Sequence, residues 1–252
     1  MRRRPGGQRS TSKRRAPKRS QIRRARKRPF ILVLAGVNGA GKSSVAGDML
    51  KEHGVPWFNP DAYARELIQR LGCTRDEADA EAWASGKRRL EAALAEGTDY
   101  AFETTLGGAT ISRLLVSAAA THHISMIYCG LDSIEKHMSR VRLRVEHGGH
   151  DIPEERIRAR WSSSRENLVA LLPHLFHLQV FDNSVDVAPG EPVPDPKLIL
   201  EMKQGVLLAP ALDDAEACET VPDWAKPVVA AAFRLHKERS GSRHRRSNPL
   251  PP

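Results

Sequence analysis

The sequence predicts an α/β fold in which a mostly parallel β-sheet carries helices on both faces. Short apolar runs alternate along the chain with longer stretches rich in Ala, Leu, Glu and Arg, which is the pattern of successive βα units. The first apolar run, residues 30–35, is continuous rather than alternating, as expected of a strand covered on both faces. A chain of 252 residues can bury a full core, so we expect one folded domain with appendages.

The expected elements follow in order from residue 30. The expected strands are residues 30–35, 55–58, 100–103, 124–129 and 178–181. The expected helices are residues 42–51, 61–71, 77–96, 109–120, 133–146, 153–172 and 224–237, with a hairpin over 198–208. Gly97 is placed to stop the third helix, and Pro153 stands at the first-turn position that proline favours. We find no internal repeat.

Charge is distributed very unevenly along the chain. Residues 1–28 hold 14 Lys or Arg and no acid, and residues 234–252 add a further +5. Subtracting both from the total of +10 leaves residues 29–233 with a net charge of −9. The basic ends have almost nothing apolar to bury, so residues 1–28 and 239–252 are expected to be disordered. They could hold RNA, DNA or an acidic partner by counterion release, or be solvated tails.

The composition argues against a membrane or disulfide-rich protein. No run approaches the ~20 apolar residues that a membrane helix needs, so we expect no membrane partner. Cys73, Cys129 and Cys218 are odd in number and widely spaced, outside any zinc or disulfide pattern. A reducing cytoplasm is the expected compartment.

A phosphate-binding motif follows the first expected strand. Gly36 to Ser43 matches G-x-x-x-x-G-K-[ST] at every fixed position, between a strand and a helix as the motif requires. Inward backbone N–H groups and the helix dipole should hold phosphates, with Lys42 on the β- and γ-phosphates and Ser43 on Mg²⁺. The alternative is a glycine turn before Lys-Ser. The expected fold is a three-layer P-loop NTPase, and its expected ATP contacts are Gly36, Asn38, Gly39, Ala40, Gly41, Lys42, Ser43 and Ser44.

Missing motifs narrow the P-loop chemistry. The guanine-reading N-K-x-D motif is absent, which disfavours a GTPase, and so is the L-S-G-G-Q signature of transport-type ATPases. The short chain is typical of a small-molecule kinase.

Two carboxylates stand where neighbouring parallel strands should end. Asp61 follows the apolar residues 55–58, and Glu103 ends the next strand. The carboxyl ends of such strands form the ligand crevice, where a carboxylate can act on an attacking hydroxyl. Asp61 could instead be a helix N-cap, and Glu103 a plain strand-terminal charge.

Arginines flank a glycine hinge at Gly148. Arg140 and Arg144 share a helix face, and Arg156 and Arg160 repeat the spacing on the next helix. Such helices are typical of a lid that closes arginines onto transferring phosphates. Surface arginines paired with nearby glutamates would look the same.

Together these segments resemble the zeta toxin family of P-loop kinases. The resemblance spans about residues 30–183 and rests on the phosphate loop, residues 59–61, 102–106, 140–145 and 148–157, and the closing 181–184. It implies an ATP-dependent kinase that phosphorylates UDP-N-acetylglucosamine on a sugar hydroxyl. It allows an antitoxin partner without implying toxicity.

The resemblance also implies site residues. Lys42 would be the P-loop lysine, Asp61 would activate the hydroxyl, and Glu103 and Thr105 would contact the substrate. Arg144 and an arginine of residues 156–160 would stabilise the phosphates. We therefore expect catalytic roles for Lys42, Asp61, Arg144, Arg156 and Arg160, and substrate contacts from Asp61, Glu103, Thr105 and Arg140.

The expected organisation is a basic tail at 1–28, a kinase domain at 29–185, an extension at 186–238 packed on that domain, and a basic tail at 239–252. A competing interpretation is a nucleic-acid-associated P-loop NTPase or polynucleotide kinase that uses the basic tails.

Overall fold

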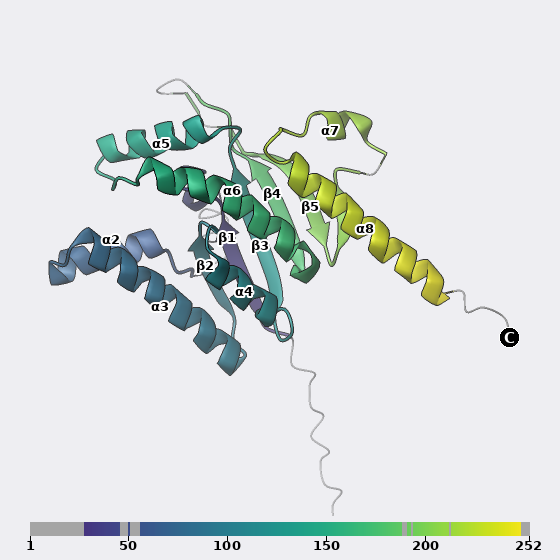
Figure 1. Cartoon of the computed structure of the whole chain (residues 1–252), viewed down its shortest axis with the longest axis horizontal. Coiled ribbons are helices and arrows are strands. Elements are labelled where there is room, and N and C mark those ends of the chain that lie inside the picture. Colours follow the sequence, from purple (N-terminus) through teal and green to yellow (C-terminus); the bar gives the residue numbers. More distant parts are fainter. Residues whose placement is uncertain are drawn as a thin grey trace, which may run out of the picture.

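The computed structural model describes residues 28–45, 50, 56–187, 191–192, 194–211 and 213–247. Its centre is one six-stranded sheet in the order β2-β1-β3-β4-β5-β6. The strands are β1 (Phe30–Ala35), β2 (Tyr100–Thr104), β3 (His123–Gly130), β4 (His177–Asp182), β5 (Lys197–Lys203) and β6 (Val206–Ala209). β1 to β4 are parallel to one another, whereas β5 and β6 are antiparallel (Figure 1). The predicted mostly parallel α/β fold is confirmed.

Helices precede or follow most strands. They are α2 (Pro60–Leu71), α3 (Arg75–Glu96), α4 (Ala109–Ala118), α5 (Ile134–Glu146), α6 (Glu154–Leu171), η1 (Leu172–His174), α7 (Ala215–Glu219) and α8 (Lys226–Ser247). The helix expected after the phosphate loop is present at residues 42–45 and 50, and its other residues lie outside the described ones. α3 begins two residues earlier than expected because Thr74 and Glu77 form a reciprocal capping box.

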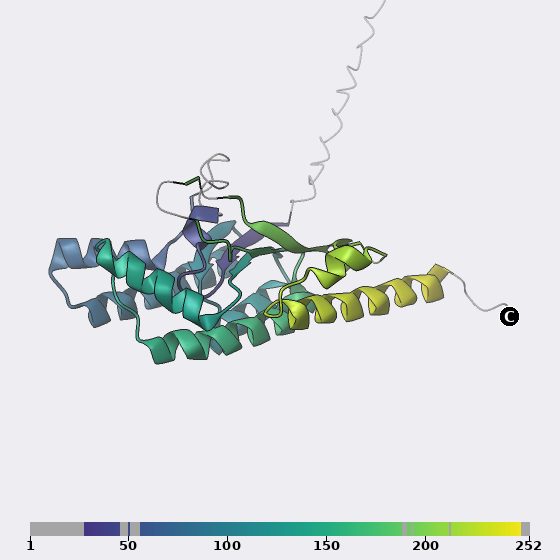
Figure 2. The ribbon, with the colours of Figure 1, turned by 90° about the horizontal axis from the view of Figure 1, so that it is seen from above.

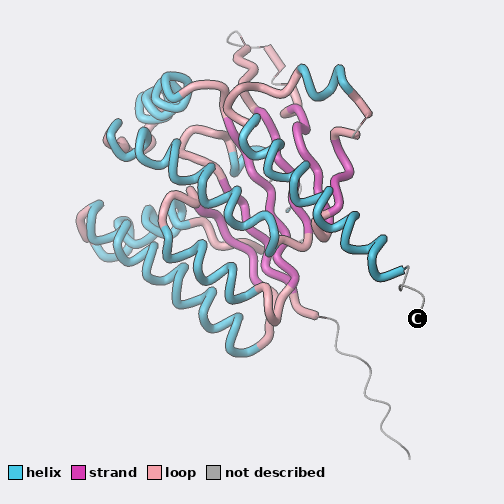
Figure 3. The backbone as a smooth tube through the Cα atoms, turned by 45° about the vertical axis from the view of Figure 1, so that its right-hand side comes forward, coloured by secondary structure: helices cyan, strands magenta, loops and turns pink. Residues whose placement is uncertain are grey.

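The main core lies between one face of the sheet and helices α3, α4, α6 and α8. Alternate residues of each strand point into it, for example Ile31, Val33 and Ala35 of β1, as the strand period of two requires. Figure 2 shows α6 and α8 on the same side of the sheet, and Figure 3 shows them crossing its strands. Each buried aliphatic side chain there stabilises the fold by roughly 1.5–3 kcal/mol.

The opposite face is covered differently. A smaller cluster joins Leu34, Ile127 and Cys129 of the sheet to Val45 and Leu50 of the phosphate-loop helix. Among the described residues this helix is the cover of that face, and it lies near the carboxyl ends of the strands. Burial raises the pKa of the Cys129 thiol to about 12, which keeps it protonated and unreactive.

The C-terminal region is part of the same sheet rather than a separate layer. The predicted hairpin is present as β5 and β6, which extend the sheet beyond β4. Trp224 packs directly over Gly130, where a Cβ would collide with its ring, and its Nε1 donates to Asp182 at 3.1 Å. These contacts tie residues 197–247 to the end of the sheet near the phosphate loop.

The tail expected at residues 239–252 starts inside a helix. α8 continues to Ser247, and Arg239 anchors it by donating to the carbonyls of Gln204 at 2.7 Å and Pro173 at 2.9 Å. Tertiary hydrogen bonds of this kind cannot be seen in a basic composition, so the expectation of disorder was wrong for residues 239–247. Residues 1–27 and 248–252 lie outside the described residues. No helix in the described part of the chain is long and apolar enough to span a membrane.

Candidate active site

The phosphate loop leaves the carboxyl end of β1 in the middle of the sheet. Gly36 has φ +141° and lies against the Cys129 carbonyl, so a Cβ has no room there. Gly39 has φ +81°, and its Cβ would lie 2.8 Å from the His137 carbonyl oxygen. The loop is therefore pressed between β3 and α5, and its glycines are needed for both conformation and space.

Side chains from three other elements hold the loop by its oxygen atoms. The His137 Nδ1–H donates to the Asn38 carbonyl at 2.7 Å, and Arg160 donates to the Asn38 side-chain oxygen at 2.6 Å. Asn183 donates to the Ala40 carbonyl at 3.0 Å. Because these oxygens are engaged from outside, the loop is fixed before any ligand arrives.

Lys42 begins the helix after the loop and is half-buried. Its Nζ donates to the Val37 carbonyl at 3.3 Å across the loop. Burial lowers the pKa of Lys42, and the charges of Glu103 and Asp61 act in the opposite direction. The ammonium therefore contacts the loop and lines the same cavity as the two carboxylates that the sequence singled out.

Glu103 ends β2 beside the loop and is only 7% exposed. Its Oε2 accepts from the Ser43 hydroxyl at 3.2 Å, and its Oε1 accepts from Trp57 Nε1 and Asn59 Nδ2, each at 3.0 Å. The carboxylate is thus locked in one orientation, with one oxygen directed at the phosphate-loop hydroxyl.

The helix that carries Asp61 is capped by a different residue. Asn59 is the N-cap of α2, and its side chain accepts from the Ala62 N–H at 2.9 Å while Pro60 opens the helix. Asp61 is therefore released from the capping role that the sequence left open. Its carboxylate is 41% exposed at the helix N-terminus.

Three cationic or titratable side chains surround the Asp61 carboxylate. Arg144 of α5 lies 3.5 Å away, His150 of the following loop 3.9 Å, and Arg75 of α3 4.0 Å. Arg75 also pairs with Asp79 at 2.6 Å. Burial lowers the pKa of His150, so that ring is neutral at pH 7. The Asp61 carboxylate of α2 thus interacts with side chains of both α3 and α5.

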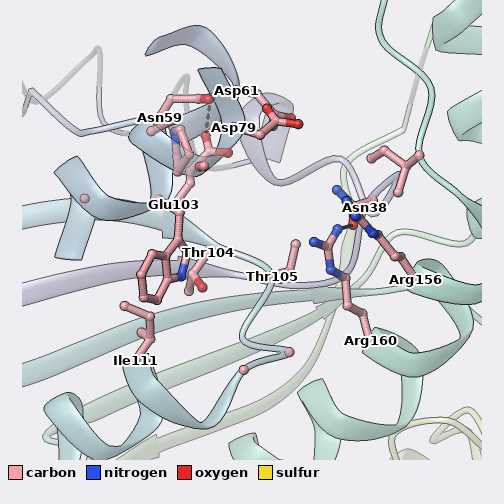
Figure 4. A pocket seen from close by; sticks show the side chains of 18 of the residues that line it. Asn38, Asn59, Asp61, Asp79, Glu103, Thr104, Thr105, Ile111, Arg156 and Arg160 are labelled. Atoms are coloured by element: carbon pink, nitrogen blue, oxygen red, sulfur yellow. Dashed lines mark hydrogen bonds between the residues drawn. The ribbon is translucent and has the colours of Figure 1, made fainter. Parts of the chain in front are cut away.

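A cavity of about 730 Å³ connects these groups. Lys42, Asp61 and Glu103 line it together with Thr105, and Arg156 and Arg160 of α6 line it as well. Figure 4 shows the two arginines and Asn38 on one side of the cavity, Asp61 and Glu103 on the other, and Thr105 between them. Burial, and then the charge of Arg156, lower the pKa of Arg160, although it stays far above neutrality.

Two expected arginines lie elsewhere. Arg140 donates to the Val185 carbonyl at 3.0 Å and pairs with Asp186 at 2.8 Å, so it points to the loop after β4 and not into the cavity. Arg144 faces Asp61 without lining the cavity. No cluster of three or more His, Cys, Asp or Glu suited to a metal occurs within the described ranges.

A protein-family model described as an AAA domain matches residues 31–168, which is more than half of the chain. The chain belongs to this AAA domain family. The matched region runs from β1 through α6 and so contains the phosphate loop, Asp61, Glu103 and the arginine-bearing helices. No curated protein matches the chain.

Solved structures share the fold of this AAA domain. A chain of the AvrRxo1-ORF1:-ORF2 complex with ATP has a TM-score of 0.56 at 16% identity, covering 78% of this chain and 64% of that one. The native form of the complex gives 0.53 at 16% identity, covering 82% and 71%. A structure of the PezAT toxin-antitoxin system of Streptococcus pneumoniae gives 0.47 at 16% identity, covering 62% and 68%. The chain has a P-loop kinase-like fold and resembles the zeta toxin family.

Three residues of the AAA domain site were missed by the interpretation of the sequence. Arg75 reaches Asp61 only because α2 and α3 pack against each other. His150 lines the cavity beside Asp61, and a single histidine in a loop carries no signal for such a position. Asn59 precedes a proline at a helix start, which is a recognisable cap signal that could have freed Asp61 in advance.

Proposed function

We propose that the protein is an ATP-dependent kinase that transfers the γ-phosphoryl group to a hydroxyl of a small molecule. The observation that carries the proposal is that Lys42, Asp61 and Glu103 line one cavity at the mouth of the phosphate loop. Nucleotide binding by the loop would not by itself require Asp61 in the cavity in addition to Glu103. The ATP in the AvrRxo1-ORF1:-ORF2 structure agrees with the proposed donor.

Asp61 is the proposed general base. Its carboxylate is partly exposed to the cavity and not used for capping, so an acceptor hydroxyl can approach it. In the proposed step the acceptor oxygen bonds to the γ-phosphorus, the bond to the β,γ-bridging oxygen breaks, and Asp61 takes the hydroxyl proton. ADP leaves with the bridging oxygen.

The cations of the site can stabilise the negative charge on the phosphoryl group during transfer. Lys42 lies against the loop and lines the cavity, and Arg156 and Arg160 line it from α6. Fixed positive charge in an enclosed site stabilises a phosphoryl-transfer transition state without reorganisation at the moment of reaction. Arg144 would orient Asp61 rather than bind phosphate, since it faces that carboxylate.

The donor atoms beside the loop suit Mg²⁺. Ser43 Oγ and Glu103 Oε2 are 3.2 Å apart, and hard oxygen atoms of this type are the ligands that Mg²⁺ prefers, with phosphates and water completing its shell. Ser43 would hold the ion directly, with Glu103 adjacent. When bound, Mg²⁺ neutralises charge on the phosphates.

The first acceptor to test is UDP-N-acetylglucosamine, because of the resemblance to zeta toxins. The cavity, at about 730 Å³, lies within the ~300–1,000 Å³ range usual for small-molecule sites. Phe58, Trp83 and Ile111 supply apolar lining beyond Asp61, so the acceptor has room for a ring as well as hydroxyls.

The test is incubation of the full chain with ATP and Mg²⁺, first with UDP-N-acetylglucosamine and then with a metabolite extract. The expected result is a species that gains one phosphate by mass spectrometry, absent with Asp61→Asn. ATP hydrolysis that occurs only when RNA or DNA is added would instead favour the nucleic-acid-associated NTPase. Phosphate on an oligonucleotide 5′ end would favour a polynucleotide kinase.

A further inference from the structure

At the end opposite the phosphate loop, none of the helices that the structure describes covers one face of the sheet. Because Ile31, Ile124 and Met202 point into the main core, the alternate residues Phe30, His123 and Lys203 belong to the other face. The described part of the phosphate-loop helix packs farther along that face, on Leu34, Ile127 and Cys129. Near the amino ends of the strands no described helix covers it, and Figure 2 shows α6 and α8 on the far side.

Aromatic rings lie in a row across this region. Phe30 of β1 is directly paired with His123 of β3 and is 38% exposed. The His123 ring contacts the Phe176 ring, with centroids 4.1 Å apart. The Phe176 backbone bridges the sheet, donating to the Ile124 carbonyl and accepting from Gln204. Main-chain hydrogen bonds therefore place the three residues side by side, with the His123 and Phe176 rings tilted by 37°.

Cations border the rings. The Lys203 ammonium lies 5.8 Å from the centre of the Phe176 ring. Arg28 directly precedes β1, and its guanidinium donates to the Ala119 carbonyl after α4 at 2.5 Å. Burial, and then the charge of Arg28, lower the pKa of His123, so its ring is neutral at pH 7 and stacks as an uncharged plane. Two acids are near: Asp99 accepts from the Phe30 N–H at 2.9 Å, and Glu201 accepts from His177 at 2.8 Å.

We propose that this surface, made by Phe30, His123, Phe176, Lys203 and Arg28, binds single-stranded nucleic acid. Rings at the surface of a sheet are stacking platforms for unpaired bases, and here Phe30 is exposed while His123 and Phe176 are half-buried. Flanking Lys and Arg side chains contact the backbone phosphates. Arg28 is also the last residue of the segment that holds 14 bases and no acid, so that segment joins the fold at this surface. Its charge adds a sequence-independent attraction for phosphates.

The surface is separate from the cavity. The strands β1, β3 and β4 are parallel, so their amino ends all lie at one end of the sheet, and the phosphate loop lies at the other. Nucleic acid bound there would locate the enzyme without entering the phosphoryl-transfer site. Nucleic-acid binding at this surface and phosphoryl transfer in the cavity can therefore be tested independently.

The test is fluorescence anisotropy of the full chain with a labelled single-stranded RNA or DNA of about 12 nucleotides, and with the matching duplex. Lys203→Glu and Phe30→Thr are the test variants, and Arg113→Glu, an exposed arginine on α4, is the matched charge control. Circular dichroism and thermal melting check the fold of each. Anionic lipid vesicles serve as a second polyanion.

Tighter binding of the single strand than of the duplex is expected. Phe30→Thr should weaken it by at least about 5-fold, from lost stacking. Lys203→Glu should weaken it and lower the salt slope by about 1, whereas Arg113→Glu should change it less than about 2-fold. The proposal is overturned by absence of binding at low salt, by both test variants binding like the wild type, by equal affinity for the duplex, or by binding to vesicles alone.

Discussion

The two halves of the candidate site are built in opposite ways. The phosphate-loop half is held from several sides: Asn38 and Ala40 are buried, and side chains of α5, of α6 and of the loop after β4 donate to their oxygen atoms. The acceptor half is open, and Asp61 is held there by ion pairs 3.5–4.0 Å long on a carboxylate that is 41% exposed.

The difference indicates which step each half serves. A rigid loop binds the part of the substrate that is always the same, the triphosphate, and gains affinity from preorganisation. Ion pairs at an exposed carboxylate are individually weak, so an acceptor can displace them at little cost. We expect substitutions in the first half to affect donor binding and catalysis together, and those in the second half to affect catalysis alone.

The largest effect is expected for Lys42→Ala. The variant removes the ammonium that lies against the loop, so ATP-dependent turnover should fall at least ~1,000-fold, the upper range for a single electrostatic group. ATP consumption in a coupled assay measures it. Turnover within ten-fold of wild type would show that the loop does not act in transfer.

Asp61→Asn should separate the two halves. The amide keeps the shape of the side chain but cannot take a proton, so kcat should fall at least ~100-fold while nucleotide affinity stays within about 2-fold. Stopped-flow turnover and calorimetric ATP titration give the two numbers. An unchanged kcat would remove Asp61 from its proposed role.

Arg144→Gln and Arg140→Gln form a matched pair on one helix. Arg144 faces Asp61, whereas Arg140 faces Asp186, so we expect kcat to fall roughly 10-fold for the first and less than about 2-fold for the second. A larger loss from Arg140→Gln would restore the substrate contact that the sequence predicted for it.

The smallest expected effect concerns stability and pH. Burial lowers the pKa of His137 to about 4, against about 6.5 in an unfolded chain. Between those values the unfolded chain binds a proton that the folded one excludes, so stability falls as pH drops from about 6.5 to 4, by at most about 1.4 kcal/mol per pH unit.

His137→Gln retains a donor for the Asn38 carbonyl but does not titrate. Its melting temperature should therefore change less over that pH range than the wild-type value, although it is lower at pH 7. Exposed His174→Gln is the control and should retain the wild-type slope. Parallel curves for the wild type and His137→Gln would contradict the assignment.

Much of the phosphate-loop half was predictable because its parts are adjacent in the chain. Gly36 to Ser43 form a local motif between a strand and a helix, and local geometry follows from local sequence. For the acceptor half, the sequence predicted only that carboxylates stand at the ends of strands, and not which side chains surround Asp61. Arg75 and His150 come from α3 and from a loop, and only packing brings them to Asp61. Residues 239–252 were expected to be disordered, whereas α8 continues to Ser247 and Arg239 anchors it.

The sequence by itself determined the parallel sheet, the phosphate loop and the two carboxylates, because periodicity and a contiguous motif act through near neighbours. Only the tertiary structure decided that Asn59 caps α2 and frees Asp61, that Arg144 rather than Arg140 meets Asp61, and that the His123 and Phe176 rings come into contact. Side chains far apart in the chain meet through packing, and the direction in which each one points depends on that packing.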